Sequence, residues 1–158
     1  MAIIRVMRKI FISHESVAKR EAIKLKELLS QTVLSNSQEA EFFLTSDWYS
    51  LESGAPWFNP LIEQLRDADG VITIITRPEA FRNLWISFEI GVAYGSRKYP
   101  KIFVFGGVPW DDIPHPLGGL QLSDTGDTNR WIGDLRNLLE VEDLSKELQA
   151  EFAILFRH

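Results

Sequence analysis

The chain has 158 residues, of which 45% are hydrophobic and 25% charged, and its net charge is -5. This composition is typical of a single globular domain with a hydrophobic core, and it excludes a disordered tail or a mini-protein. The absence of cysteine excludes disulfides, thiolate metal ligands and a cysteine nucleophile. The acidic balance argues against a nucleic-acid partner, because affinity for phosphate backbones depends on clustered Lys and Arg.

Two further observations concern location and metals. Residues 1–9, MAIIRVMRK, lack the long apolar core and the small-residue cleavage site of an export signal. No stretch approaches the roughly 20 apolar residues that span a bilayer. We therefore expect a cytoplasmic protein that does not bind a membrane. His14, His115 and His158 share no metal-ligand spacing, so we also expect no metal site.

Strand-like and helix-like segments alternate along the chain, which is typical of a parallel sheet covered by helices. The predicted strands are residues 9–13, 41–45, 70–76 and 101–105, with a short fifth strand at 117–122. The predicted helices are residues 17–30, 57–67, 84–94 and 129–139. This order predicts an α/β, flavodoxin-like, doubly wound parallel sheet of five strands with helices on both faces.

The last part of the chain differs in composition from the rest. Residues 1–140 are predicted to form the domain described above. After them comes an acidic segment whose apolar stripe has the spacing of a helix, and this stripe comprises Leu144, Leu148, Phe152, Leu155 and Phe156. We predict that residues 141–158 form an amphipathic helix, which either packs on the domain or leads to a further region or partner.

The carboxyl ends of the predicted strands are the expected ligand site. Residues 70–76, GVITIIT, are β-branched and almost continuously apolar, as in a central strand buried on both faces. In a doubly wound sheet, ligands bind in the crevice beyond the carboxyl ends of the strands. This rule places Ser13, His14, Arg77 and the loop that contains Asp47 near one crevice.

The predicted helix of residues 84–94, LWISFEIGVAY, is apolar over most of its circumference but carries one carboxylate. At about 100° per residue, Glu89 lies on the same apolar arc as Trp85. An ionised carboxylate in apolar surroundings is costly unless it is paired, hydrogen-bonded or open to a cleft. Glu89 is therefore either a structural partner of Arg82 or Arg97, or part of a working site.

Several segments together resemble one known family. They are FISH at residues 11–14, the loop of residues 48–57 with its glycine and proline, the apolar strand ending at Thr76, and Trp85-x-x-x-Glu89. In this order they resemble a Toll/interleukin-1 receptor (TIR) domain of the bacterial type, over roughly residues 8–140. The loop lacks the Arg-Asp and Pro-Gly pattern of animal adaptor TIR domains.

The resemblance implies an enzymatic function. It implies that Glu89 is the catalytic residue of an NAD+ glycohydrolase, which releases nicotinamide together with ADP-ribose or a cyclic product. NAD+ is then a substrate, and no cofactor is expected. The resemblance also implies homo-oligomers through TIR-TIR contacts and a role in bacterial antiphage defence. The alternatives are a non-catalytic TIR interaction or scaffold module, and an enzyme similar to nucleoside deoxyribosyltransferases.

Other positions are candidates for binding the substrate. They are Ser13, His14, Asp47, Trp48, Trp57, Arg77 and Trp85. Ser13 and His14 either donate to a phosphate or, through Ser13 or Ser16, cap the first helix. Trp48 and Trp57 either stack on a base or anchor their loop. Asp47 binds a ribose or caps a turn, and Arg77 binds a diphosphate or is solvated.

Overall fold

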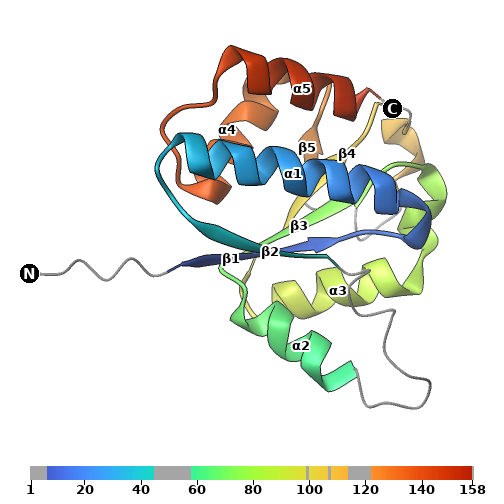
Figure 1. Ribbon diagram of the computed structural model, residues 1–158. Helices are drawn as coiled ribbons and strands as arrows, with labels where there is room; N and C mark the ends of the chain where they lie inside the picture. The colour runs from blue at the N-terminus through green and yellow to red at the C-terminus, as the bar shows by residue number, and fades with distance from the viewer. Residues whose placement is uncertain (1–6, 45–57, 99, 107, 114–121, 158) are drawn as a thin grey trace, which may run out of the picture.

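The computed structural model describes residues 7–44, 58–98, 100–106, 108–113 and 122–157. Its centre is a five-stranded sheet with the strand order β2-β1-β3-β4-β5, and every pair of neighbours is parallel (Figure 1). The strands are β1 (Arg8–Ser13), β2 (Ala40–Leu44), β3 (Gly70–Ile75), β4 (Lys101–Val104) and β5 (Leu122–Asp124). The predicted flavodoxin-like, doubly wound α/β fold is confirmed.

β3 lies in the middle of the sheet, and every one of its residues is buried. Its apolar sequence predicted this, because a strand covered on both faces needs no polar side. The parallel register with β1 places Ser13 opposite Thr73. Because the strands are parallel, they end on the same side of the sheet. We call this side, where β1 ends at Ser13 and β3 at Ile75, the carboxyl edge.

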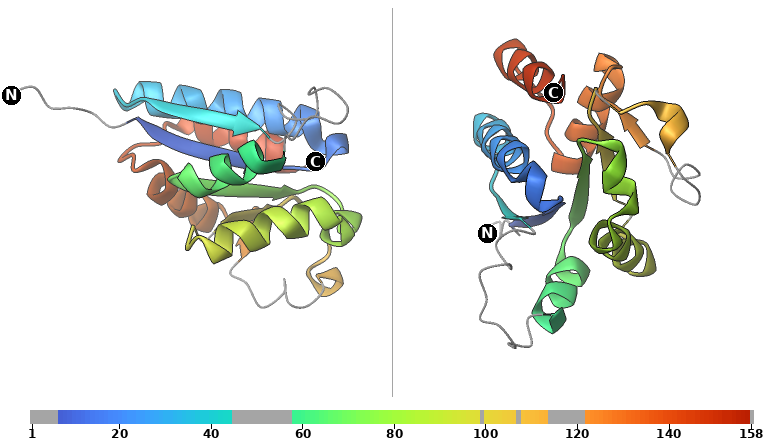
Figure 2. Two further views of the ribbon diagram at one scale, coloured as in Figure 1. Left: turned by 90° about the horizontal axis from the view of Figure 1, so that it is seen from below. Right: turned by 90° about the vertical axis from the view of Figure 1, so that its right-hand side faces the viewer.

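Helices cover both faces of the sheet, as Figures 1 and 2 show. The helices are α1 (Lys19–Ser35), α2 (Phe58–Asp67), α3 (Leu84–Gly95), α4 (Thr128–Leu139) and α5 (Lys146–Phe156). Short 3-10 helices precede α1 and α3 at η1 (Ser16–Ala18) and η3 (Pro78–Arg82), and a further one is η4 (Trp110–Asp112). We call the side with α1, α4 and α5 the first face, and the side with α2 and α3 the second face.

The first face is covered by one large apolar cluster. Ile10 and Ile12 of β1 and Ile72 of β3 pack there with buried residues of α1, α4 and α5. α5 contributes Phe152 and Phe156, whose ring centroids lie 6.0 Å apart. The buried side of α5 is therefore continuous with the core of the sheet.

The second face is covered by smaller clusters. One joins Phe11 of β1 and Val71 of β3 to Leu61 of α2 and Ala93 of α3. Another joins Ile75 of β3, at the carboxyl edge, to buried residues of η3, α3 and β4. Residues alternate between the two faces along a strand, so Ser13 and Thr73 project to the second face together with Phe11 and Val71.

Two predicted element bounds were wrong. The first helix was predicted to end at Ser30, but α1 continues to Ser35 because the buried Thr32 and Val33 extend its core-facing stripe. The fifth strand was predicted to end at Leu122, but β5 (Leu122–Asp124) extends past that residue. Its pairing with β4 sets this register, and residues 114–121 lie outside the described residues.

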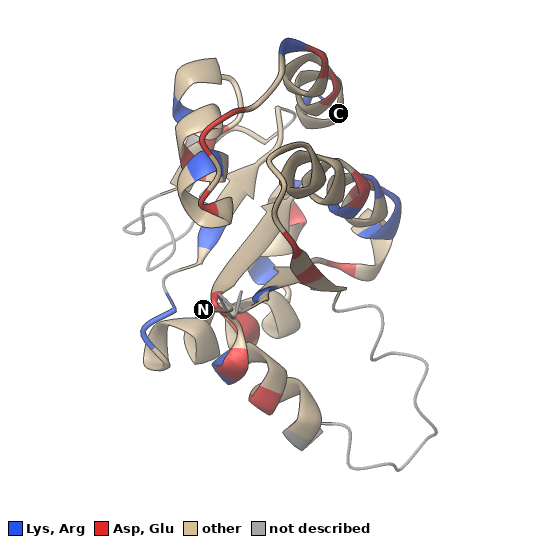
Figure 3. Cartoon of the chain, turned by 60° about the vertical axis from the view of Figure 1, so that its left-hand side comes forward, with Lys and Arg blue, Asp and Glu red and all other residues tan. Residues whose placement is uncertain are grey.

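Charged residues of both signs are interspersed over the helices (Figure 3). On α1, for example, the Nζ atom of Lys24 lies 3.8 Å from Glu27 and 3.5 Å from Glu151 of α5. Such exposed pairs contribute little stability. That the chain does not bind nucleic acid stays a prediction.

Candidate functional site

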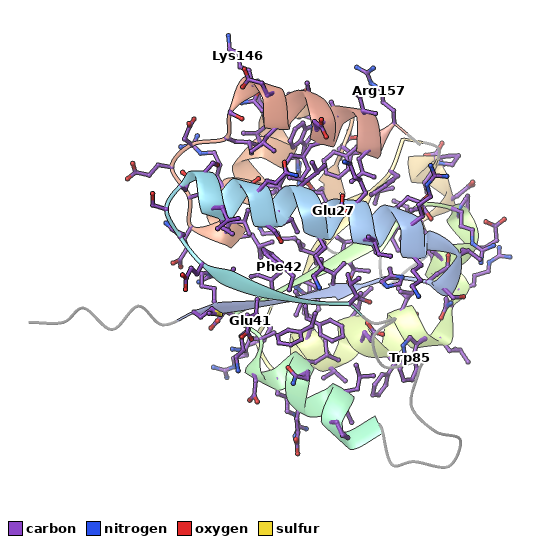
Figure 4. The ribbon with its side chains drawn as sticks, in the orientation of Figure 1. Glu27, Glu41, Phe42, Trp85, Lys146 and Arg157 are labelled. Carbon is purple, nitrogen blue, oxygen red and sulfur yellow. The ribbon has the colours of Figure 1, made fainter. Side chains whose placement is uncertain are left out.

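The carboxyl edge brings together several of the predicted site residues. β1 ends at Ser13 and continues into His14, while Arg77 follows the end of β3. η3 then reverses the chain direction, so α3 begins at the same edge and runs back along the second face (Figure 1). Figure 4 shows Trp85 at this end of α3. Glu89 lies one helical turn after Trp85.

Glu89 is fully buried, with 0% of its surface exposed. Ala93, one turn further along α3, packs in the cluster with Phe11 and Val71, while Ile86 and Ile90 pack in the cluster with Ile75. Glu89 lies on the helix arc between Trp85 and Ala93, which both pack with Phe11 and Val71, so it belongs to the side of α3 that faces the sheet. The burial predicted from the helical pattern is confirmed.

The arginines predicted as alternative partners of Glu89 do not fill that role among the described residues. Arg82 and Arg97 are both exposed. Neither takes part in an ion pair within the described part of the chain. A salt bridge to one of these arginines is therefore not the reason why Glu89 is buried.

Ser13 and Thr73 form a polar layer on the second face. They are opposite each other in the β1-β3 register, and each has 0% of its surface exposed. Neither hydroxyl has a hydrogen-bond partner among the described residues. The same face carries the buried carboxylate of Glu89 on α3. Sequence reasoning missed Thr73, although its polar side chain interrupts an otherwise apolar strand.

The predicted capping role of Ser13 is wrong. Ser13 is the last residue of β1, and Ser16 is the first residue of η1. The residues that precede η1 and α1 make no side-chain capping hydrogen bond. β1 ends at Ser13 as predicted, and Ser13 is paired with Thr73 in the sheet, so it does not serve as the cap of the helix that follows.

His14 is buried at the carboxyl edge. Its Nδ1 atom lies 2.6 Å from the carbonyl oxygen of Glu15. A carbonyl oxygen only accepts, so Nδ1 is the donor in this hydrogen bond. The bond fixes the orientation of the ring, and the predicted contact of His14 with a phosphate stays a prediction.

The clearest polar structure at this edge joins Glu15, Arg77 and Asn83. The side chain of Glu15 is 3% exposed and that of Arg77 is 45% exposed. Arg77 donates from Nε and Nη2 to the two carboxylate oxygens of Glu15, at 2.9 and 3.0 Å. The Nδ2 atom of Asn83 donates to Oε1 of Glu15 at 3.3 Å. Sequence reasoning missed Glu15 and Asn83 as parts of the site.

The Glu15 carboxylate is held in its charged form. The hydrogen bonds from Arg77 lower the pKa of Glu15 below its ordinary value of 4.5; burial acts in the opposite direction, and Asn83 adds to the lowering. The same hydrogen bonds raise the pKa of Arg77. Arg77 thus follows β3 as predicted, with a carboxylate as its partner. Binding of a diphosphate by Arg77 stays a prediction.

Trp85 is half-buried in the first turn of α3 and contacts the cluster of α2 and β1 residues. Its ring stacks on that of Phe88, with a centroid distance of 5.8 Å and an interplanar angle of 25°. This contact orients the indole at the carboxyl edge. Asp47, Trp48 and Trp57, predicted to contribute from the loop, lie outside the described residues.

A cavity of about 330 Å³ lies next to the start of α3. Its lining within the described residues comprises Pro78, Glu79, Phe81, Arg82 and Asp112. This lining contains neither Glu89 nor any predicted substrate-binding residue. The cavity is therefore separate from the polar layer of the second face.

The described ranges contain neither a metal-binding cluster nor a membrane-spanning helix. Within them, no group of His, Asp and Glu side chains is arranged to hold a metal ion. In the same ranges, no helix combines the length and apolar character needed to cross a bilayer.

Comparison with known proteins finds no matching family model and no matching curated protein. The fold and the site geometry therefore define the class of the molecule. It is a doubly wound, flavodoxin-like α/β domain whose second face buries a carboxylate and two hydroxyl groups, with an ion pair at the carboxyl edge.

Proposed function

We propose that the chain is an NAD+ glycohydrolase of the TIR type and that Glu89 is its catalytic residue. The observation that carries the proposal is the burial of Glu89, with 0% exposure, on the helix that covers the second face. Ser13 and Thr73 add buried hydroxyl groups to that face. In doubly wound sheets, the carboxyl ends of the strands are where ligands bind.

A single carboxylate is sufficient for the proposed reaction. When the bond between nicotinamide and ribose breaks, its electron pair neutralises the pyridinium nitrogen, so the leaving group needs no proton. Glycosidases that expel an alcohol require a second carboxyl group as a general acid. Glu89 would instead stabilise the positive charge that develops on the ribose. Water then adds to the ribose carbon and releases a proton to solvent.

The test compares two glutamate variants. We expect Glu89→Gln to lower nicotinamide release from NAD+ at least about 100-fold, because a preorganised charge at the reacting centre is lost. The matched control is Glu63→Gln, which removes an exposed carboxylate from the neighbouring helix α2 and should leave the rate unchanged. The protein is assayed at high concentration and with a crowding agent, since the TIR resemblance implies activity on assembly. Thermal unfolding checks that each variant is folded.

Two results would contradict the proposal. Wild-type protein that releases no nicotinamide under these conditions, although it is folded, would favour the interaction or scaffold module. Full activity of folded Glu89→Gln would exclude a catalytic role for this carboxylate. Cleavage of nucleosides in place of NAD+ would identify the alternative similar to nucleoside deoxyribosyltransferases.

A further inference from the structure

We propose that Glu15, Arg77 and Asn83 are positioning residues, which fix the first turn of α3 against the carboxyl end of β1. Glu89 lies on the next turn of the same helix, so the network sets where its carboxylate stands. The inference rests on the proposed function, because that function assigns the chemistry to Glu89.

The network connects three segments that are distant in the chain. Glu15 follows β1, Arg77 follows β3, and Asn83 immediately precedes α3. The two-point contact from Arg77, at 2.9 and 3.0 Å, fixes the plane of the Glu15 carboxylate. The Asn83 bond to Oε1, at 3.3 Å, then connects this carboxylate to the start of α3.

Asn83 has two roles at once. Its Oδ1 atom accepts hydrogen bonds from the backbone nitrogens of Trp85 and Ile86, at 2.9 and 3.3 Å, and so caps α3. Its Nδ2 atom donates to Glu15. Since a carboxylate only accepts and a backbone N-H only donates, the amide has a single favourable orientation. The helix start therefore cannot shift along the sheet without breaking a bond on one side of Asn83.

Contact with the substrate is a weaker explanation for this network. The Glu15 side chain is 3% exposed, and Arg77 directs its Nε and Nη2 atoms to Glu15. The positive charge of Arg77 is therefore already compensated before an anion arrives. A positioning role predicts an effect on the catalytic step, whereas a binding role predicts an effect on substrate affinity.

A comparable ion pair at the opposite end of β1 provides a control. Arg8 Nη1 lies 3.0 Å from Glu140 Oε1, and Arg8 Nη2 donates to the carbonyl of Leu138 at 2.8 Å. This pair links the start of β1 to the end of α4 and includes no residue of α3. Glu140→Gln therefore removes an ion pair of similar length without altering the proposed network.

The decisive variant is Asn83→Asp. Aspartate caps helices about as well as asparagine, so the bonds to Trp85 and Ile86 are kept. Its carboxylate cannot donate to Glu15, and the two negative charges repel each other. We expect kcat for nicotinamide release to fall about tenfold, with KM within about twofold of wild type, because the reacting groups are misplaced rather than removed.

The double variant Glu15→Gln/Asn83→Asp removes the repulsion between the two carboxylates and lets the introduced glutamine amide donate to the introduced carboxylate. It does not restore the bond from Arg77 Nη2, because that bond ends on the same Glu15 oxygen as the bond from Asn83. We therefore expect kcat to lie between those of Asn83→Asp and wild type, and Glu140→Gln to leave kcat unchanged. Three results would overturn the inference: wild-type kcat in Asn83→Asp, a double variant no more active than the single one, or a raised KM with unchanged kcat.

Urea unfolding of the same variants separates this inference from the proposed function. Non-additive effects of Glu15→Gln and Asn83→Asp on the free energy of unfolding support the link between these residues, whether or not the wild type is active. A wild type that releases no nicotinamide rejects the proposed function alone. Additive effects together with an unchanged kcat reject the link and leave the proposed function intact.

Discussion

The two faces of the sheet are built from the same strands but differ in what they bury. On the first face, Ile10, Ile12, Ile72 and Ile74 form an uninterrupted apolar surface under α1, α4 and α5. On the second face, the alternate positions of the same strands end in Ser13 and Thr73, under a helix that buries Glu89. Among the described residues, the first face holds one large apolar cluster, whereas the second holds two smaller ones and keeps polar groups at the carboxyl edge.

The two faces also differ in whether their buried hydroxyl groups are hydrogen-bonded. Thr32 of α1, on the first face, donates to the carbonyl of Leu28 at 2.8 Å. On the second face, the hydroxyls of Ser13 and Thr73 have no such partner within the described residues. A buried polar group without a partner lowers stability. Such a group is retained where it serves another purpose, and a ligand site is the purpose that we propose.

The largest effect on stability is expected from the first face. Phe152 is fully buried, and its ring contacts those of Trp131 and Phe156, with centroids 5.9 and 6.0 Å away. We expect Phe152→Ala to lower the free energy of unfolding by about 3–5 kcal/mol, because it leaves a cavity in the core. Urea unfolding measures this change. A loss below about 1 kcal/mol would show that the first face does not dominate stability.

Two substitutions with smaller and opposite expected effects on the free energy of unfolding compare the two faces directly. Thr73→Val removes a hydroxyl without a described partner, so we expect the free energy of unfolding to rise by about 1 kcal/mol while nicotinamide release falls. Thr32→Val removes a bonded hydroxyl, so we expect it to lower stability by about 1 kcal/mol and to leave activity unchanged. Urea unfolding and the nicotinamide assay test both. If both substitutions changed the free energy of unfolding in the same direction, the two faces would not differ in how their buried hydroxyl groups affect stability.

The smallest expected effect concerns pH at the carboxyl edge. The pKa of Glu15 in the folded chain lies below its ordinary value of 4.5, so its ion pair adds stability above pH 4.5, which is lost as pH falls through the lowered pKa. The groups that face Glu15 are Arg77 and Asn83, and the charge of Glu79 also contributes to the raised pKa of Arg77. We expect wild type to be more stable than Glu15→Gln at pH 7, with the difference narrowing below pH 4.5. A difference that does not change with pH in urea unfolding would contradict this.

Much of the fold could be predicted from local patterns. The β-branched sequence of β3 indicated a central strand, and the helical period placed Glu89 on a buried arc of α3. The end of α1 and the end of β5 were harder to predict from the sequence. Core packing decides the first, and pairing with β4 decides the second. A signal for Glu15 was present, since it lies two residues after the end of the first strand, but its polar segment was interpreted as a helix start.

The sequence by itself determined which segments form strands and helices, because apolar periodicity is a property of neighbouring residues. It also determined that Glu89 would be buried. Only the tertiary structure decided what surrounds that carboxylate. Ser13 and Thr73 are brought together by strand register, and Glu15 meets Arg77 and Asn83 across 62 and 68 positions of the chain. No local pattern specifies such pairs, because they depend on how the parallel strands align and where α3 begins.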